Sequence, residues 1–213
     1  GCSSVTGLVV DAPGGRESLE KYEGDYALQL ARRGYVTMAF DFPGFGRRGT
    51  EAVPSKQMLS RALMVGRPYL GWCVANAMAA LTVLRTWPTV RPDRVGVMGF
   101  SMGGTLAGMT AAVDERVCAA ALSGRFPSWR DRLARGSAME LACIPGMVRQ
   151  LDLGDMLAAA VPVPLFVSME VRGDPEKSRQ LLAPIRRAYQ GFNAMDRLTE
   201  YYDNAPRHRF VGE

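Results

Sequence analysis

The chain has 213 residues, of which 47% are hydrophobic and 22% charged, proportions that are ordinary for a globular domain. Its formal charge of +5 comes mostly from arginines scattered singly or in pairs, without a basic block interleaved with aromatics, so we expect no nucleic-acid partner. No apolar run approaches the roughly 20 residues that span a bilayer, so we expect no membrane segment.

Apolar strands and helices alternate along the chain. Strands that are apolar from end to end are predicted at residues 6–10, 35–40, 94–98, 118–122, 163–171 and 198–202. Helices are predicted at residues 22–33, 75–86, 102–112 and 177–190. Two stretches have no clear assignment: residues 51–70 are mixed in character, and residues 123–160 are irregular with helical pieces.

Continuous apolar strands are typical of a parallel sheet that is buried on both faces. Their alternation with helices therefore predicts an α/β fold, with a mostly parallel central sheet and helices on both faces. No internal repeat, low-complexity tract or linker interrupts the pattern, so we expect residues 1–213 to form a single domain.

A serine motif lies between the third predicted strand and the helix that follows it. Gly99-Phe100-Ser101-Met102-Gly103 matches G-x-S-x-G in the strand–turn–helix context that the chemistry needs. On such a turn the serine hydroxyl projects from the sheet at a helix N-terminus, and the flanking glycines avoid collisions. The pattern predicts Ser101 as a nucleophile, with the Met102 backbone N–H facing a developing oxyanion. The alternative is a tightly packed glycine loop with an incidental serine.

A serine nucleophile needs a general base, and His208 is the only histidine in the chain. It follows the last predicted strand, so we expect it to be the base of Ser101, the alternative being a surface histidine between two arginines. In hydrolases with this motif, the triad carboxylate lies between serine and histidine along the chain. Asp174, just after the fifth predicted strand, is the first candidate, Glu170 is the next, and Asp203 lies closest to the histidine in sequence.

The loop after the first predicted strand is the expected source of a second oxyanion donor. It contains consecutive glycines, which allow the backbone to approach a substrate closely. We expect the N–H of Gly15 or Arg16 to contribute, the alternative being a plain turn.

Four cysteines are present, none of them in a C-x-x-C pair, and a single histidine accompanies them. This composition makes a zinc site improbable, so we expect no metal. The cysteine usage favours a reducing compartment and therefore a cytoplasmic location. Gly1-Cys2 is like the junction of a bacterial lipoprotein, but a predicted core strand follows almost at once, so we expect no lipid anchor.

Taken together, these segments resemble the α/β-hydrolase superfamily, and within it the dienelactone-hydrolase-like and acetyl-esterase-like enzymes, over nearly the whole chain. Besides the serine motif, Asp174 and His208, the similarity rests on Ala12-Pro13-Gly14-Gly15, Arg33-Gly34-Tyr35-Val36, Asp41-Phe42-Pro43-Gly44-Phe45-Gly46, Asp93-Arg94-Val95-Gly96, Pro164-Leu165-Phe166-Val167 and Arg209-Phe210. The resemblance implies an α/β-hydrolase fold, a triad of Ser101, Asp174 and His208, an acyl-enzyme intermediate and no cofactor.

The chain departs from this family in three respects. It has Ser101 where dienelactone hydrolases proper use cysteine, and it has Asp11 and Ala12 where relatives often carry His-Gly. The elements identified also lack the family's usual first two strands and final helix. These departures make the specific activity of dienelactone hydrolases doubtful for this chain.

The expected function is that of a serine hydrolase acting on small or short-acyl carboxylic esters. The alternatives are an acyltransferase or thioesterase with the same triad, and a non-catalytic remnant of the hydrolase fold. Residues 123–160 are a candidate lid, from which Phe126, Trp129 and Met147 are expected to line an acyl pocket, with core packing an equal alternative. The expected partner is a small-molecule ester, and a homo-oligomer stays open.

Overall fold

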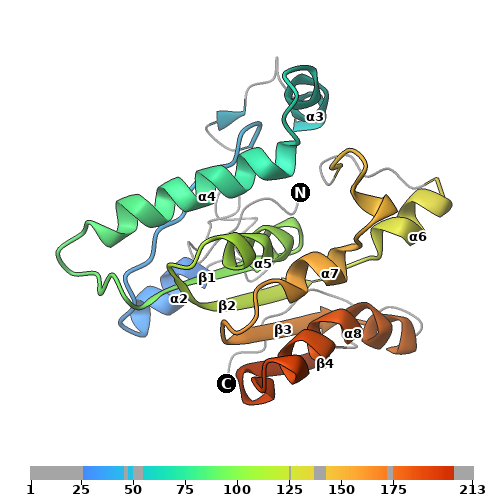
Figure 1. Ribbon diagram of the computed structural model, residues 1–213. Helices are drawn as coiled ribbons and strands as arrows, with labels where there is room; N and C mark the ends of the chain where they lie inside the picture. The colour runs from blue at the N-terminus through green and yellow to red at the C-terminus, as the bar shows by residue number, and fades with distance from the viewer. Residues whose placement is uncertain are drawn as a thin grey trace.

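The structure is a computed structural model that describes residues 26–45, 48–49, 55–124, 126–136, 143–171 and 175–203, apart from the side chains of Ser55, Lys56, Lys177 and Asp203. Its centre is a parallel sheet of four strands in the spatial order β1-β2-β3-β4 (Figure 1). The strands are β1 (Val95–Phe100), β2 (Val117–Gly124), β3 (Leu165–Glu170) and β4 (Leu198–Asp203). Because all four run the same way, their carboxyl ends form one edge of the sheet.

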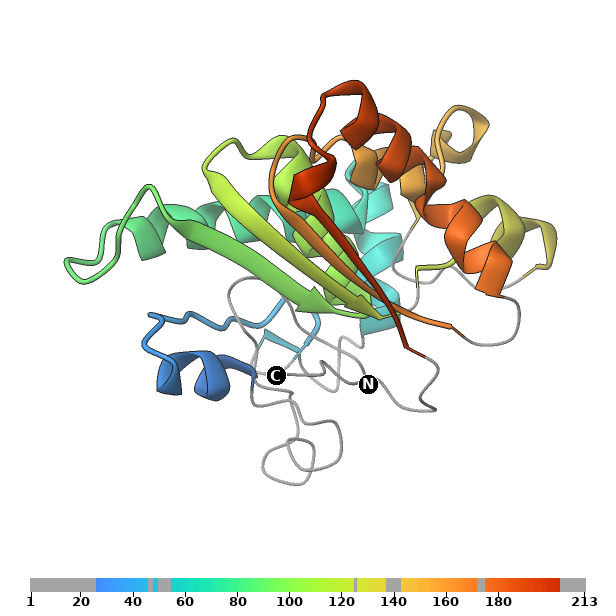
Figure 2. The same ribbon diagram turned by 90° about the horizontal axis from the view of Figure 1, so that it is seen from below.

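Helices lie on both faces of this sheet. They are α2 (Tyr26–Arg32), α3 (Ser55–Met64), α4 (Tyr69–Arg85), α5 (Met102–Val113), α6 (Trp129–Ala134), α7 (Leu153–Ala158) and α8 (Pro175–Gly191), with 3-10 turns η2 (Met147–Arg149) and η3 (Met195–Arg197). Figure 2 shows α4, α5, α7 and α8 on one face and α2 on the other. The predicted α/β architecture is therefore confirmed.

The hydrophobic core lies between the sheet and the layer formed by α4, α5, α7 and α8. Side chains alternate along β1, so that Val95 and Val97 are buried while Met98 is only partly buried. α5 approaches α7 so closely that a Cβ added at Gly108 would collide with Leu157. The small residues of α5 therefore let neighbouring helices pack backbone to side chain over the sheet.

An ion-pair cluster fastens β4 to α8. The Arg186 guanidinium donates hydrogen bonds of 2.9 Å from Nε and 2.7 Å from Nη2 to the Glu200 carboxylate. The Tyr202 hydroxyl donates to the same carboxylate at 2.9 Å and also contacts Arg186. This partly buried, two-pronged pairing is the geometry in which an ion pair contributes measurably to stability.

Four of the six predicted strands are confirmed as β1 to β4, and three of the four predicted helices lie within α4, α5 and α8. The described part of the helix predicted at residues 22–33 is α2. The strand predicted at residues 6–10 lies outside the described residues. The buried strand predicted at residues 35–40 is wrong. These residues pair with no described strand, and Tyr35 is 64% exposed. An apolar run indicates a tendency to be buried and does not by itself supply a pairing partner.

The unassigned residues 51–70 contain α3 and the first two residues of α4. Pro68 is the N-cap of α4, and Tyr69 and Leu70 are fully buried directly after it. Among the described helices, none has both the length and the apolar character needed to cross a membrane. The single-domain organisation stays a prediction.

Candidate active site

Ser101 occupies a strained turn between β1 and α5. Its backbone angles are φ 56° and ψ −121°, a conformation that residues with a side chain rarely adopt. Its backbone N–H donates a 2.7 Å hydrogen bond to the carbonyl of Ser123, which holds the turn against β2. The geometry is that of a residue forced out of the sheet at the carboxyl end of its strand.

The Ser101 side chain does not cap the helix that follows it. It makes no capping hydrogen bond to α5, and the residue is partly exposed. The first turn of a helix has backbone N–H groups without intrahelical acceptors, and α5 begins at Met102. The N–H of Met102 therefore lies at the positive end of a 12-residue helix, where an oxyanion would be stabilised.

Gly124, at the end of β2, supports this turn from the neighbouring strand. It has φ +126°, and a Cβ there would lie 2.8 Å from the Ser101 nitrogen and 3.0 Å from the Ser101 Cα. Sequence reasoning missed this residue. The available signal was a Ser-Gly pair that closes the apolar run of β2.

Gly104, the residue directly after the serine motif, has a packing role. A Cβ at this position would lie 2.8 Å from Cζ of Phe126 and 2.9 Å from the carbonyl oxygen of Ser123. The first turn of α5 therefore rests directly on the Phe126 ring and on β2. Any side chain at Gly104 would lift the helix end that carries the Met102 N–H.

The remaining predicted catalytic residues lie outside the described residues. These are Asp174, His208, Gly15 and Arg16. Glu170, the second candidate for the triad carboxylate, is described: it ends β3 and is 5% exposed. Ser101, the candidate nucleophile, and the buried carboxylate of Glu170 lie at the carboxyl edge of the same sheet, where sites of open α/β folds gather.

The predicted acyl-pocket residues lie in and beside the core. Phe126 and Trp129 are each 2% exposed and belong to the core cluster, while Met147 is partly exposed and packs against it. In the second half of the candidate lid segment, α7 buries Leu153 and Leu157 in the same core. The pocket and lid interpretations stay predictions, and the Phe126 ring packs against Gly104 in the first turn of α5.

Asp152 joins the start of α6 to the start of α7. Its carboxylate accepts hydrogen bonds from the Ser128 hydroxyl at 2.5 Å and from the backbone N–H groups of Trp129 and Leu153 at 2.7 Å each. Asp155 completes a capping box by accepting from the Asp152 N–H at 2.8 Å. Burial alone would raise the pKa of Asp152, but these hydrogen bonds outweigh it and lower the pKa below its usual value.

The loop that follows residues 35–40 is fastened to α4. The buried Tyr69 hydroxyl donates to the carbonyl of Pro43 at 2.7 Å, and burial raises the pKa of Tyr69. One turn further along α4, burial raises the pKa of Cys73 to about 12, so this thiol stays protonated near neutral pH. Arg48 adds hydrogen bonds to the Asp41 carbonyl at 3.1 Å and the Asn76 side chain at 2.8 Å.

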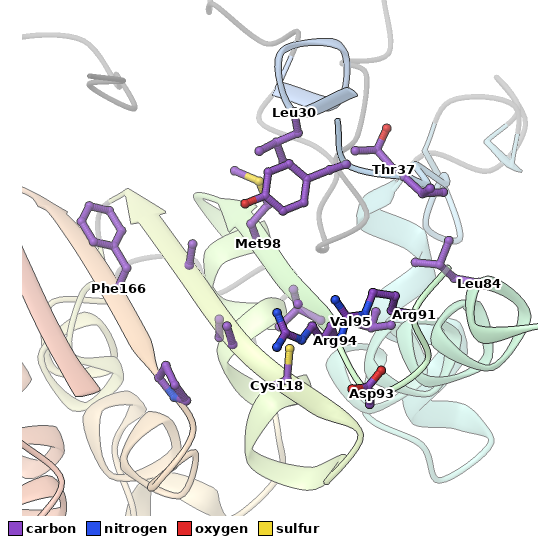
Figure 3. A pocket seen from close by; sticks show the side chains of 18 of the residues that line it. Leu30, Thr37, Leu84, Arg91, Asp93, Arg94, Val95, Met98, Cys118 and Phe166 are labelled. Atoms are coloured by element: carbon purple, nitrogen blue, oxygen red, sulfur yellow. The ribbon is translucent and has the colours of Figure 1, made fainter. Parts of the chain in front are cut away.

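A cavity of about 1020 Å³ lies on the face of the sheet that is turned away from α5. Figure 3 shows Met98, Cys118 and Phe166 on its sheet side, with Leu30 and Thr37 across from Met98. Ser101 is not among its lining residues, so this cavity is separate from the serine turn. Within the described part of the chain, no group of three or more His, Cys, Asp or Glu side chains gathers where it could hold a metal.

Comparison with known proteins gives a family and a fold. The sequence profile of the Dienelactone hydrolase family matches residues 8–128, more than half of the chain. The chain is 35% identical over 89 residues to "Putative hydrolase YtaP" of Bacillus subtilis, a match that covers 42% of this chain and 29% of YtaP. A second match, 29% identical over 130 residues, is an uncharacterized Pseudomonas aeruginosa protein, of which 32% is covered. The chain thus spans about a third of the length of these curated relatives.

Solved structures resemble the chain more extensively. The "putative acetyl xylan esterase" of Bacteroides fragilis superposes with a TM-score of 0.69 at 23% identity, over 93% of this chain and 55% of that one. The Pyrococcus furiosus esterase PF2001 superposes with a TM-score of 0.59 at 20% identity, over 88% of this chain and 68% of that one. At these identities the likeness establishes the fold alone.

Proposed function

Because the chain belongs to the dienelactone hydrolase family and has the α/β-hydrolase fold, we propose that it cleaves small or short-acyl carboxylic esters through an acyl-enzyme on Ser101. One observation carries the proposal: Ser101 is a partly exposed serine on a strained turn at the N-terminus of α5, and its side chain makes no capping hydrogen bond to that helix. Backbone strain of this kind, held by the surrounding structure, clusters at active sites.

The reaction proceeds in two steps. His208 takes the proton of the Ser101 hydroxyl as the serine oxygen bonds to the ester carbonyl carbon. The π-electron pair of the carbonyl moves onto the carbonyl oxygen, which becomes an oxyanion. The Met102 N–H and a second N–H, from Gly15 or Arg16, stabilise that oxyanion. Collapse of this tetrahedral intermediate expels the alcohol, which takes the proton from the His208 imidazolium. Water then attacks the acyl-enzyme by the same route, releasing the acid and restoring Ser101.

Asp174 serves in this proposal as the carboxylate that orients His208. The choice of an ester as substrate is supported by the two solved neighbours, both named as esterases. The buried Phe126 ring, which packs against Gly104 in the first turn of α5, supports a short acyl group, because a bulky ring there leaves little depth for a pocket beside that turn.

Ser101→Ala tests the nucleophile. Its expected effect is a loss of at least about 10³-fold in kcat for p-nitrophenyl acetate, together with loss of labelling by a fluorophosphonate probe. Ser60→Ala, at an exposed serine on α3, is the matched control and should keep both properties. Undiminished hydrolysis by the Ser101→Ala protein would refute the proposal, as would a wild-type protein that neither hydrolyses the ester nor reacts with the probe.

A further inference from the structure

The cavity on the sheet face turned away from α5 has an apolar floor. Met98, Ala121 and Phe166 pair side by side across β1, β2 and β3, and all three are partly exposed and line the cavity. Both faces of a parallel sheet are normally covered, because its side chains are apolar on each. At about 1020 Å³, the cavity is at the upper end of the range of about 300–1,000 Å³ that is usual for small-molecule sites.

The floor has a trough along β2. This strand contributes only small residues to the lining, the cysteine and three alanines at positions 118–121. Bulkier side chains stand on the strands to either side, Met98 on β1 and Phe166 on β3 (Figure 3). A slender, flexible hydrocarbon chain fits such a trough and buries its apolar surface there.

The charged residues of the lining gather at one end of the trough, the amino edge of the sheet, where the strands begin. Arg91, Asp93 and Arg94 come just before β1, and Figure 3 shows them at the opposite end of the cavity from Leu30. One more aspartate and one more arginine, at positions 196 and 197, come just before β4. Three arginines and two aspartates leave a net positive charge at this edge, and every other described residue of the lining is uncharged.

The turn that carries Arg91 and Arg94 is held through its backbone. The Arg94 N–H donates to the Arg91 carbonyl at 3.0 Å, and Nε of Arg85, at the end of α4, donates to the Pro92 carbonyl at 2.8 Å. Both residues of the pair are exposed, and neither guanidinium forms an ion pair with another described residue. A guanidinium binds a carboxylate through two parallel hydrogen bonds, so this turn offers a carboxylate two donors on a fixed backbone.

We propose that the cavity binds an amphipathic carboxylate of the fatty-acid class, with its hydrocarbon chain along β2 and its carboxylate at Arg94 and Arg91. The distribution of polarity sets both the class and the orientation of the ligand. A cationic amphiphile would meet positive charge at the amino edge, and a small polar anion would leave the apolar floor in water. Because Ser101 does not line the cavity, this inference is independent of the proposed ester hydrolysis.

Calorimetric titration with dodecanoate, below its micellar concentration, tests the site. We expect a one-to-one complex, and at least about fivefold weaker binding of dodecan-1-ol and of dodecyltrimethylammonium. Arg94→Gln should weaken the binding of dodecanoate about fivefold and leave that of dodecan-1-ol unchanged, because only the carboxylate pairs with the guanidinium.

Arg187→Gln is the matched control. It removes the same charge from an exposed arginine on α8, which lies on the other face of the sheet. Its affinity for dodecanoate should equal that of the wild type. Neither Arg94→Gln nor Arg187→Gln should change kcat for p-nitrophenyl acetate, since neither arginine belongs to the proposed catalytic machinery.

Cys118 gives a second readout that needs no substitution, because it is exposed and lines the cavity. Bound dodecanoate should slow the alkylation of this thiol by N-ethylmaleimide, followed for each cysteine by mass spectrometry of peptides. Cys143 is partly exposed and is not among the lining residues, so its alkylation rate should stay the same.

Three results would overturn the inference. The first is a wild-type protein that does not bind dodecanoate, and the second is equal weakening by Arg94→Gln and Arg187→Gln. The third is a Cys118 that, without ligand, reacts as slowly as the buried Cys73, because protein would then fill the cavity. Ester hydrolysis that persists in any of these cases would show that the proposed function survives the loss of this site.

Discussion

Gly124 lies so close to Ser101 that a methyl group on the glycine would sit 2.8 Å from the serine nitrogen. The contact connects β2 to the nucleophile turn, and the 2.7 Å hydrogen bond from Ser101 to the Ser123 carbonyl runs beside it. The position of the candidate nucleophile is therefore set by the neighbouring strand as much as by its own motif.

Gly124→Ala should reduce both stability and activity. The positive φ of Gly124 disfavours any side chain, at a cost of about 1–3 kcal/mol, and the new methyl group would displace Ser101. Urea unfolding measures the first effect, and kcat for p-nitrophenyl acetate measures the second.

Gly34→Ala is the matched control, because Gly34 has φ +88° and a methyl group added there would meet no atom within 4 Å. It should lose similar stability and keep its kcat. Equal loss of kcat in the two variants would show that the contact between Gly124 and Ser101 does not position the nucleophile.

Asp152→Asn should destabilise the protein by about 2 kcal/mol near neutral pH, because the carboxylate caps two helices and accepts the Ser128 hydroxyl. The pKa of Asp152 is lower in the folded than in the unfolded chain. Its stabilisation is therefore complete above the unfolded pKa, near 4, and is lost as the pH falls through the folded value. Urea midpoints of the two proteins, measured between pH 7 and pH 3, should converge on acidification.

Asp131→Asn, at an exposed carboxylate in α6, provides the comparison for Asp152. Its unfolding midpoint should stay close to that of the wild type throughout the pH range. A gap between the wild type and Asp152→Asn that persists unchanged at pH 3 would mean that the capping charge is not what stabilises these helix starts.

Phe126→Ala should widen the range of acyl groups accepted. If the ring forms the floor of the acyl site, removing it deepens the site, and kcat/KM for p-nitrophenyl hexanoate should rise relative to that for the acetate. Leu157→Ala, which opens the core about one turn further along the same face of α5, beside Gly108, should cost about 2–5 kcal/mol of stability without changing that ratio. An unchanged ratio in Phe126→Ala would assign this ring to core packing alone.

The serine turn could be predicted because its signal is local. Two glycines flank Ser101, an apolar run precedes it and small residues follow it, and the structure has β1, the turn and α5 in that order. The roles of Gly124 and Asp152 could not be predicted in the same way. Gly124 matters because β2 lies beside β1, and Asp152 accepts bonds from residues more than 20 positions earlier. Such contacts depend on tertiary structure, which local periodicity does not encode.

The strand order was likewise beyond the sequence pattern. Apolar runs predicted β1 to β4 within a few residues, but an identical signal at residues 35–40 corresponds to chain that pairs with no described strand. A continuous apolar run reports which residues prefer burial, whereas pairing depends on which neighbouring strand is available.

The backbone at Ser101 adopts a conformation that is more strained for a serine than for a glycine. A glycine would adopt the same dihedral angles with less strain, since it has no Cβ to clash with the preceding carbonyl. The chain nevertheless keeps a serine there, and the hydrogen bond to β2 and the close packing around the turn hold it in place. The fold thus keeps a strained backbone at a residue whose side chain is partly open to solvent.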